Sequence, residues 1–238
     1  MERPSEAHAD MAGNVWDEGR WKGVERVTLD FTTQYILERV VRHVEPAGKT
    51  IAELGAGTGR LSYLLLKRGA RKVTLLDNSR KALELSRLLF EDEAPGSHQI
   101  IDANVLSYAP SERYDVVMSS GLIDHFQGQQ RFEIIKRHVD LAAEDCVIIH
   151  PSNRRYNRLF DRTPMAIRLY GFALTYAEGE INGYLEKMDR VRNVSHERFH
   201  FFYTVPLLHN RQCLARFCER TFLGHAWGGL AITHIEVA

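Results

Sequence analysis

Three glycines at every second position are the most informative feature of this sequence. Gly55, Gly57 and Gly59 follow the apolar segment 51–54, which contains a single acid, Glu53, and they precede a predicted helix. Glycine lets a backbone come into close contact with a ligand, because it has no side chain and accepts left-handed conformations. A strand, a glycine loop and a helix in this order predict a ligand site at the end of the strand.

A second acid, Asp77, is the last residue of the next predicted strand, Val73-Thr74-Leu75-Leu76-Asp77. A glycine loop after one strand and a carboxylate at the end of the next suit a nucleoside cofactor with a free ribose diol. One carboxylate has two oxygens, so Asp77 can accept hydrogen bonds from both hydroxyls. The competing interpretation of Asp77 is a helix-capping aspartate.

The glycine spacing indicates which cofactor binds. A dinucleotide fingerprint reads G-x-G-x-x-G, whereas Arg60 occupies its third glycine position here. Glu53 would repel a pyrophosphate but suits a cationic amino group. A ligand with an ammonium group at one end and an adenosine ribose at the other is S-adenosylmethionine.

With these motifs the chain resembles the class I S-adenosylmethionine-dependent methyltransferases, especially the small-molecule type with E/D-x-G-x-G-x-G. The resemblance covers roughly residues 49–151. It implies that the loop backbone runs beside the methionine part, that Asn78, Asp102 and Ala103 contact the adenine, and that Glu53 holds the ammonium. The implied cofactor-binding residues are Glu53, Gly55, Ala56, Gly57, Asp77, Asn78, Asp102, Ala103 and Ser119.

The segment 119–126, Ser-Ser-Gly-Leu-Ile-Asp-His-Phe, resembles the fourth motif of this family. The backbone near Ser119 is expected to face the amino acid end of the cofactor. His125 is the candidate catalytic base, because a histidine with a pKa near about 6.5 can accept a substrate proton at neutral pH. A structural histidine that packs the loop is the competing interpretation. Many methyl transfers need little acid–base help, since positioning and exclusion of water supply much of the acceleration.

Four residues outside these motifs are candidates for binding the acceptor. Trp16 and Trp21 could fold over the cofactor as a lid, or simply pack on the domain. Arg154 and Tyr156 belong to an Arg- and Tyr-rich stretch that could attract an anionic acceptor or form a solvated helix face. His196 and His200 have the spacing of a helical metal pair, but no Glu motif accompanies them, so we expect no metal.

Alternating strands and helices predict how these residues are positioned. The expected fold is an α/β, Rossmann-like, seven-stranded, mostly parallel sheet with helices on both faces, and the resembled family adds an antiparallel C-terminal hairpin. One methyltransferase domain is expected over 1–238, with a tail or lid at 1–28 and an inserted cap of helices and loops at 151–205. The expected helices are 29–44, 59–68, 79–90, 129–141 and 207–222, and the expected strands are 49–54, 73–77, 98–101, 114–119, 145–150 and 230–237.

The composition limits the function classes. Lys and Arg number 31, as do Asp and Glu, so the net charge is zero, which argues against a general nucleic-acid binder. Three cysteines are too few for a disulfide framework and indicate reduced thiols in a cytoplasmic protein. No apolar run is long enough for a membrane span, and the polar start lacks a signal-peptide core. A homodimer is allowed but not required.

These observations predict methyl transfer from S-adenosylmethionine to O, N or C of a small molecule. Methyl transfer to a protein or RNA stays open, with the arginines of 154–162 as a docking patch. A nicotinamide oxidoreductase would use a similar sheet, but Arg60 and Glu53 count against it. A non-catalytic S-adenosylmethionine-binding module is the third alternative.

Overall fold

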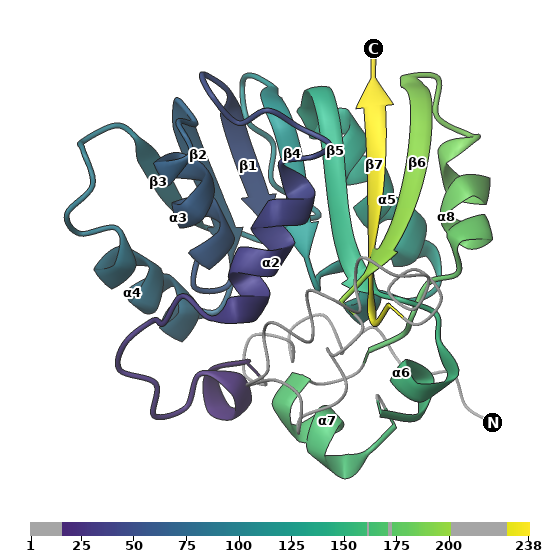
Figure 1. Ribbon diagram of the computed structural model, residues 1–238, viewed down its shortest axis with the longest axis horizontal. Coiled ribbons are helices and arrows are strands. Elements are labelled where there is room, and N and C mark those ends of the chain that lie inside the picture. The colour runs from purple at the N-terminus through teal and green to yellow at the C-terminus, as the bar shows by residue number, and fades with distance from the viewer. Residues whose placement is uncertain (1–15, 161, 171–172, 201–227) are drawn as a thin grey trace.

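A seven-stranded sheet forms the centre of the computed structural model, which describes residues 16–160, 162–170, 173–200 and 228–238 (Figure 1). The strand order is β3-β2-β1-β4-β5-β7-β6. The strands are β1 Thr50–Leu54, β2 Lys72–Asp77, β3 His98–Asp102, β4 Tyr114–Ser120, β5 Ala142–Pro151, β6 Val191–Phe199 and β7 Leu230–Val237. β1 to β5 pair in parallel, whereas β7 is antiparallel to both β5 and β6. The predicted Rossmann-like, mostly parallel sheet with an antiparallel C-terminal pair is confirmed.

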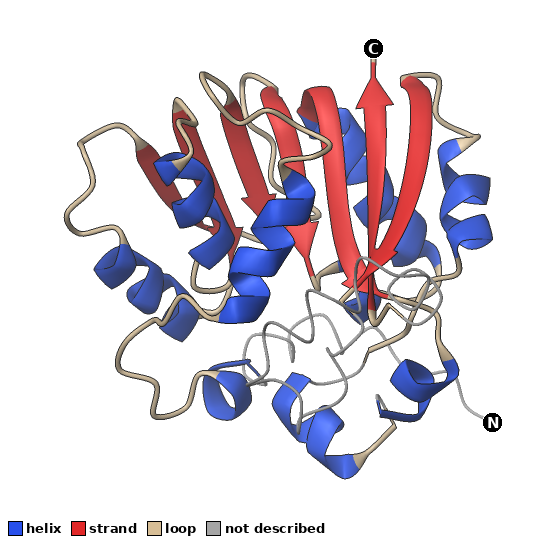
Figure 2. Cartoon of the chain, viewed as in Figure 1, coloured by secondary structure: helices blue, strands red, loops and turns tan. Residues whose placement is uncertain are grey.

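Helices cover both faces of the sheet (Figure 2). α2 Phe31–Val40, α3 Arg60–Lys67 and α4 Arg80–Leu89 lie on one face, and α5 Gln129–Leu141 and α8 Glu178–Leu185 lie on the other. The strand side chains alternate between these faces. Leu75 of β2 packs in one apolar cluster with Leu65 of α3, while Leu76 packs in the other with Ile134 of α5.

The carboxyl ends of the parallel strands meet at one edge of the sheet, and the shorter elements gather there (Figure 1). They are η1 Trp16–Arg20, η2 Ile123–His125, α6 Arg155–Phe160 and α7 Pro164–Tyr170. Short sequence signals start the helices that follow the strands at this edge. Ser79 follows β2 and begins α4 as its N-cap, because its side chain accepts a hydrogen bond from Ala82 N.

The cap predicted over 151–205 is wrong in one part, because residues 191–199 form strand β6 of the sheet. Among the described strands β6 is an edge strand whose one neighbour is β7, and most of its side chains are partly or fully exposed. Edge strands carry charged and polar side chains, which hide the alternation that identifies a strand. β6 and β7 are joined by residues 200–229 rather than by a short hairpin turn. The predicted helix at 207–222, with Cys213 and Cys218, lies outside the described residues.

In the described ranges, no helix combines the length and the apolar character that crossing a bilayer requires.

Candidate cofactor and acceptor site

The glycine loop lies between β1 and α3, and each of its glycines has a left-handed backbone. The φ angles are 62° at Gly55, 54° at Gly57 and 71° at Gly59. A Cβ atom at Gly55 would lie 2.6 Å from Leu122, and one at Gly59 would lie 2.1 Å from Leu75. Two of the three glycines therefore allow the loop to pack closely on its neighbours. Gly57 has the same backbone conformation without that crowding.

Asp77 at the end of β2 is joined to this loop by a hydrogen bond. Its Oδ2 accepts from Gly57 N at 2.7 Å, and its Oδ1 accepts from Ser79 N at 2.8 Å. Burial raises the pKa of Asp77, although these two backbone N–H groups act in the opposite direction. Each carboxylate oxygen keeps a further lone pair. The pair of oxygens beside the glycine loop therefore fits a ribose diol.

Glu53 is buried beneath the loop. Its Oε2 accepts hydrogen bonds from Ser62 Oγ at 2.6 Å and from Ser62 N at 3.1 Å. Burial raises the pKa of Glu53 to about 7. A carboxylate that is costly to ionise is stabilised by a nearby cation. No sequence motif predicts that Ser62 holds this acid, and the role of Glu53 toward the cofactor ammonium stays a proposal.

The residues predicted to contact adenine lie on the next strand end. Asp77 and Asp102 are paired in the register of β2 and β3, and Ala103 N donates to Asp77 O at 3.1 Å. Asn78 and Asp102 are exposed, while Ala103 is half-buried. The structure thus brings the acids of three neighbouring strands, at Glu53, Asp77 and Asp102, to one edge.

The side chain of Ser119 points away from the loops, into the space beneath α5. Its Oγ lies 2.8 Å from Nε2 of His138, whose Nδ1 lies 2.7 Å from the carbonyl of Ile134. Burial lowers the pKa of His138 to about 4, so its ring is neutral. A carbonyl only accepts, hence Nδ1 carries the proton and Ser119 donates to Nε2. Only the backbone of Ser119 is then available for the predicted cofactor contact.

The N-terminal tryptophans lie against both loops. The ring of Trp16 stands perpendicular to that of His125, with 5.1 Å between the ring centroids. Trp21 approaches Gly57 so closely that a Cβ there would lie 3.4 Å from its ring. The structure therefore brings these three candidate residues and the glycine loop together.

Asp17 fixes this segment, a role that no sequence motif predicts. Its Oδ1 accepts from Ser79 Oγ at 2.5 Å and from Lys81 N at 3.2 Å. It thus joins η1 to the first turn of α4. An acid beside a tryptophan carries no signal of its own, because the helix that it contacts lies far along the chain.

Asp124 adjoins the candidate base. Its Oδ2 lies 3.6 Å from Nε2 of His125, and its Oδ1 is buried with no hydrogen-bond partner among the described residues. Asp124 itself is only 4% exposed. It is therefore positioned to orient the ring of His125.

Two predicted acceptor residues lie beyond β5. Arg154 precedes α6, and its Nε is buried without a hydrogen-bond partner in the described part of the chain. Tyr156 belongs to α6, but its side chain lies outside the described residues. His196 is on β6 rather than on a helix, and it contacts Thr233 and Asn182. The described ranges hold no group of three or more side chains suited to a metal ion.

Comparisons with known proteins agree with this geometry. The profile of a methyltransferase domain family matches residues 51–144. A ubiquinone biosynthesis O-methyltransferase of Stutzerimonas stutzeri is 26% identical over 137 residues, which are 57% of this chain and 53% of that protein. One from Azoarcus is 30% identical over 118 residues, 49% of this chain and 48% of that protein. This chain therefore spans about half the length of these relatives.

A solved structure shares the fold over the whole chain. The magnesium protoporphyrin IX methyltransferase of Synechocystis PCC 6803, with S-adenosylmethionine bound, has a TM-score of 0.62. The two sequences are 15% identical, and the match covers 100% of both chains. Residues 51–144 therefore match a methyltransferase domain, the chain shares the fold of this S-adenosylmethionine-bound methyltransferase, and these matches support S-adenosylmethionine as the cofactor.

Proposed function

We propose that this protein transfers a methyl group from S-adenosylmethionine to an O, N or C atom of a small-molecule acceptor. The observation that carries the proposal is the position of the N-terminal segment. Trp16 lies against His125 and Trp21 lies against Gly57, so one short segment covers both the cofactor loop and the candidate base. Such a cover encloses a small acceptor and excludes water from the reacting atoms.

Each strand end has a separate task in the proposed binding of the cofactor. Asp77 accepts the ribose hydroxyls, and the backbone from Gly55 to Gly57 contacts the methionine part. Glu53 attracts the ammonium group from beneath the loop. Asn78, Asp102 and Ala103 line the adenine, and the backbone of Ser119 faces the amino acid end. When bound, S-adenosylmethionine supplies an electrophilic methyl group.

His125 is the proposed general base. Its ring contacts that of Trp16, and its Nε2 lies 3.6 Å from the carboxylate of Asp124, which is placed to orient the ring. Positioning of the acceptor supplies most of the acceleration in this account, so loss of His125 slows the reaction without abolishing it. Arg154 offers a buried N–H donor to a polar group of the acceptor.

A small acceptor is favoured over a nucleic acid by the overall charge, since basic and acidic residues both number 31. The curated relatives named above are ubiquinone biosynthesis O-methyltransferases, which favours an oxygen atom as the acceptor.

A labelled-methyl assay tests the proposal. The protein is incubated with S-adenosylmethionine that carries a labelled methyl group, together with a panel of phenols, carboxylates and amines, and separately with RNA and with protein extract. Label transfer to a small molecule, reduced roughly tenfold or more in His125→Ala, supports the proposal. Label that appears only in RNA or protein contradicts the small-molecule assignment. Cofactor uptake without any transfer would indicate a binding module.

A further inference from the structure

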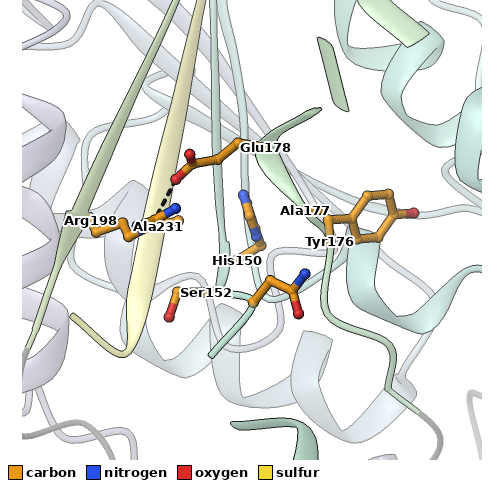
Figure 3. A pocket seen from close by; sticks show the side chains of 8 residues that line it. His150, Ser152, Tyr176, Ala177, Glu178, Arg198 and Ala231 are labelled. Atoms are coloured by element: carbon orange, nitrogen blue, oxygen red, sulfur yellow. Dashed lines mark ion pairs between the residues drawn. The ribbon is translucent and has the colours of Figure 1, made fainter. Parts of the chain in front are cut away.

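A cavity of about 110 Å³ lies at the carboxyl end of β5 (Figure 3). His150, the penultimate residue of β5, forms part of its wall, together with Ser152, Glu178 and Arg198. Figure 3 shows these side chains around one hollow, with the Tyr176 hydroxyl directed away from it. None of these residues belongs to the glycine loop, to the acids at the strand ends or to the segment 119–126.

One ring nitrogen of His150, a residue of this wall, has no hydrogen-bond partner among the described residues. The residue is 1% exposed, and its Nδ1 lies 3.0 Å from the carbonyl of Pro151. A carbonyl only accepts, so Nδ1 carries the proton and Nε2 is left with a lone pair. Nε2 is buried and has no hydrogen-bond partner among the described residues. A buried acceptor without a partner is unfavourable, and it becomes satisfied when a ligand donates a hydrogen bond to it.

The charges around the cavity favour a neutral donor. Glu178 and Arg198 form an ion pair at 2.8 Å, so the two charges of the wall compensate each other. Burial and the neighbouring His196 lower the pKa of His150, while the Pro151 carbonyl and the carboxylates of Asp124 and Glu178 act in the opposite direction. Burial has the largest effect, so the ring is kept neutral beside an ion pair whose charges compensate each other. The lone pair of this neutral ring suits the positive end of an O–H dipole.

The cavity adjoins the loop that contains the candidate base. Gly121 N, in the loop after β4, donates to the carbonyl of Ile149 at 2.8 Å, directly before His150. Asp124 acts electrostatically on His150 and lies 3.6 Å from His125. The loop 121–125, which carries the candidate base, is therefore hydrogen-bonded to the strand end that places His150 in the cavity wall.

We propose that this cavity is a subsite for the acceptor, in which a neutral hydroxyl group donates a hydrogen bond to Nε2 of His150. The proposal rests on the proposed methyl transfer and narrows its substrate class to acceptors that carry a hydroxyl on a small substituent. An apolar cavity of about 150 Å³ holds benzene, so the smaller volume here holds a group of a few heavy atoms.

Two small molecules of the same size test the hydrogen bond. 2-Propanol and acetone have the same heavy-atom skeleton, but only 2-propanol donates. We titrate each into protein labelled with ¹⁵N-histidine and follow the unprotonated Nε2 resonance of His150. We expect 2-propanol to move this resonance in a saturable way and acetone to leave it in place. Equal shifts with both molecules, or no saturable shift with either, would overturn the proposal.

Two variants of His150 test whether its Nε2 atom accepts the hydrogen bond. His150→Gln places an amide oxygen near the position of Nε2, whereas His150→Leu has no acceptor. Because the histidine resonance is lost in both, binding is followed through the backbone amides of Ser152 and Ala231. Binding of 2-propanol is expected to persist in His150→Gln and to fall at least tenfold in His150→Leu. Equal binding by the two variants would contradict the role of Nε2.

A third measurement separates this proposal from the proposed function. Because cofactor and acceptor bind together, saturating S-adenosylhomocysteine is expected to leave 2-propanol binding intact. If the nucleoside displaces 2-propanol, the cavity is not an acceptor subsite. 2-Propanol binding without any uptake of S-adenosylhomocysteine in calorimetry would contradict the proposed methyl transfer. It would also contradict the role of the cavity as an acceptor subsite, but it would still support a hydroxyl-binding site at His150.

Discussion

The carboxylate of Asp77 accepts a hydrogen bond of 2.7 Å from the backbone nitrogen of Gly57. This bond joins the end of β2 to the glycine loop after β1. The glycine loop, proposed to contact the methionine part of the cofactor, and the carboxylate, proposed to bind its ribose, are therefore fixed relative to each other before any ligand binds. Preorganisation of this kind reduces the free-energy cost of binding.

Gly57→Ala is expected to weaken cofactor binding through this bond. Gly57 has a φ of 54°, and an L-residue in that region costs about 1–2 kcal/mol. Relief of the strain moves the N–H away from Asp77. Gly48→Ala is the matched control, because Gly48 has a φ of 74° with open space around it, at the other end of β1. Both variants should melt a few degrees lower, but only Gly57→Ala should lose S-adenosylhomocysteine affinity, by roughly tenfold. Equal affinities of the two variants would contradict this account.

Binding of the cofactor is expected to strengthen as the pH rises from 6 to about 7.5. Burial raises the pKa of Glu53 to about 7, so below that value the free protein holds Glu53 protonated. A bound ammonium favours the carboxylate, so binding at low pH must release a proton. The dissociation constant of S-adenosylhomocysteine, measured by calorimetry, should fall by up to about tenfold per pH unit below pH 7. Glu53→Gln should flatten the dependence, and an unchanged slope in that variant would show that another group titrates.

Loss of Asp17 should release the N-terminal segment. Its carboxylate caps the start of α4 through Ser79 Oγ and Lys81 N, and a helix cap contributes about 1 kcal/mol. Asp17→Ala should therefore be cleaved by trypsin at Arg20 or Lys22 roughly fivefold faster than the native chain, since cleavage follows the open population. Glu18→Ala, which changes an exposed neighbouring acid, is the control. Equal cleavage rates in the two variants would mean that Asp17 does not hold the segment.

Ser119→Ala is expected to affect stability rather than binding. The substitution leaves Nε2 of the buried His138 without its donor, which costs about 1–3 kcal/mol of unfolding free energy. The change is measured by urea denaturation. Affinity for S-adenosylhomocysteine should stay within about threefold, because the Ser119 side chain points toward α5. A large loss of affinity at unchanged stability would place that side chain in the cofactor site instead.

The sheet and the cofactor loop could be predicted from the sequence because their signals are local. The apolar runs of the parallel strands, the alternating glycines and the acids at 53, 77 and 102 each lie within a few residues of one another. The helix expected at 79–90 was predicted for the same reason. The edge strand β6 was missed, because its polar residues carry no apolar alternation.

The contacts between distant segments could not be predicted in this way. Nothing near Trp16 in the sequence indicates that it contacts His125. Likewise, nothing near Asp17 indicates that it binds the start of α4. The side-chain direction of Ser119 depends on the register of β4, since neighbouring residues of a strand face opposite sides of the sheet. These contacts follow from the packing of the elements.

Isothermal titration of S-adenosylhomocysteine into the native protein and into Asp77→Ala tests the central claim most directly. We expect saturable binding by the native chain. Asp77→Ala removes the two proposed hydrogen bonds from the ribose hydroxyls to the carboxylate, so its affinity should fall by about a hundredfold or more. Asp115→Ala is the control, because Asp115 binds Thr50 at the opposite edge of the sheet, and it should retain native affinity. No uptake by folded native protein, or equal affinity in Asp77→Ala, would contradict the account.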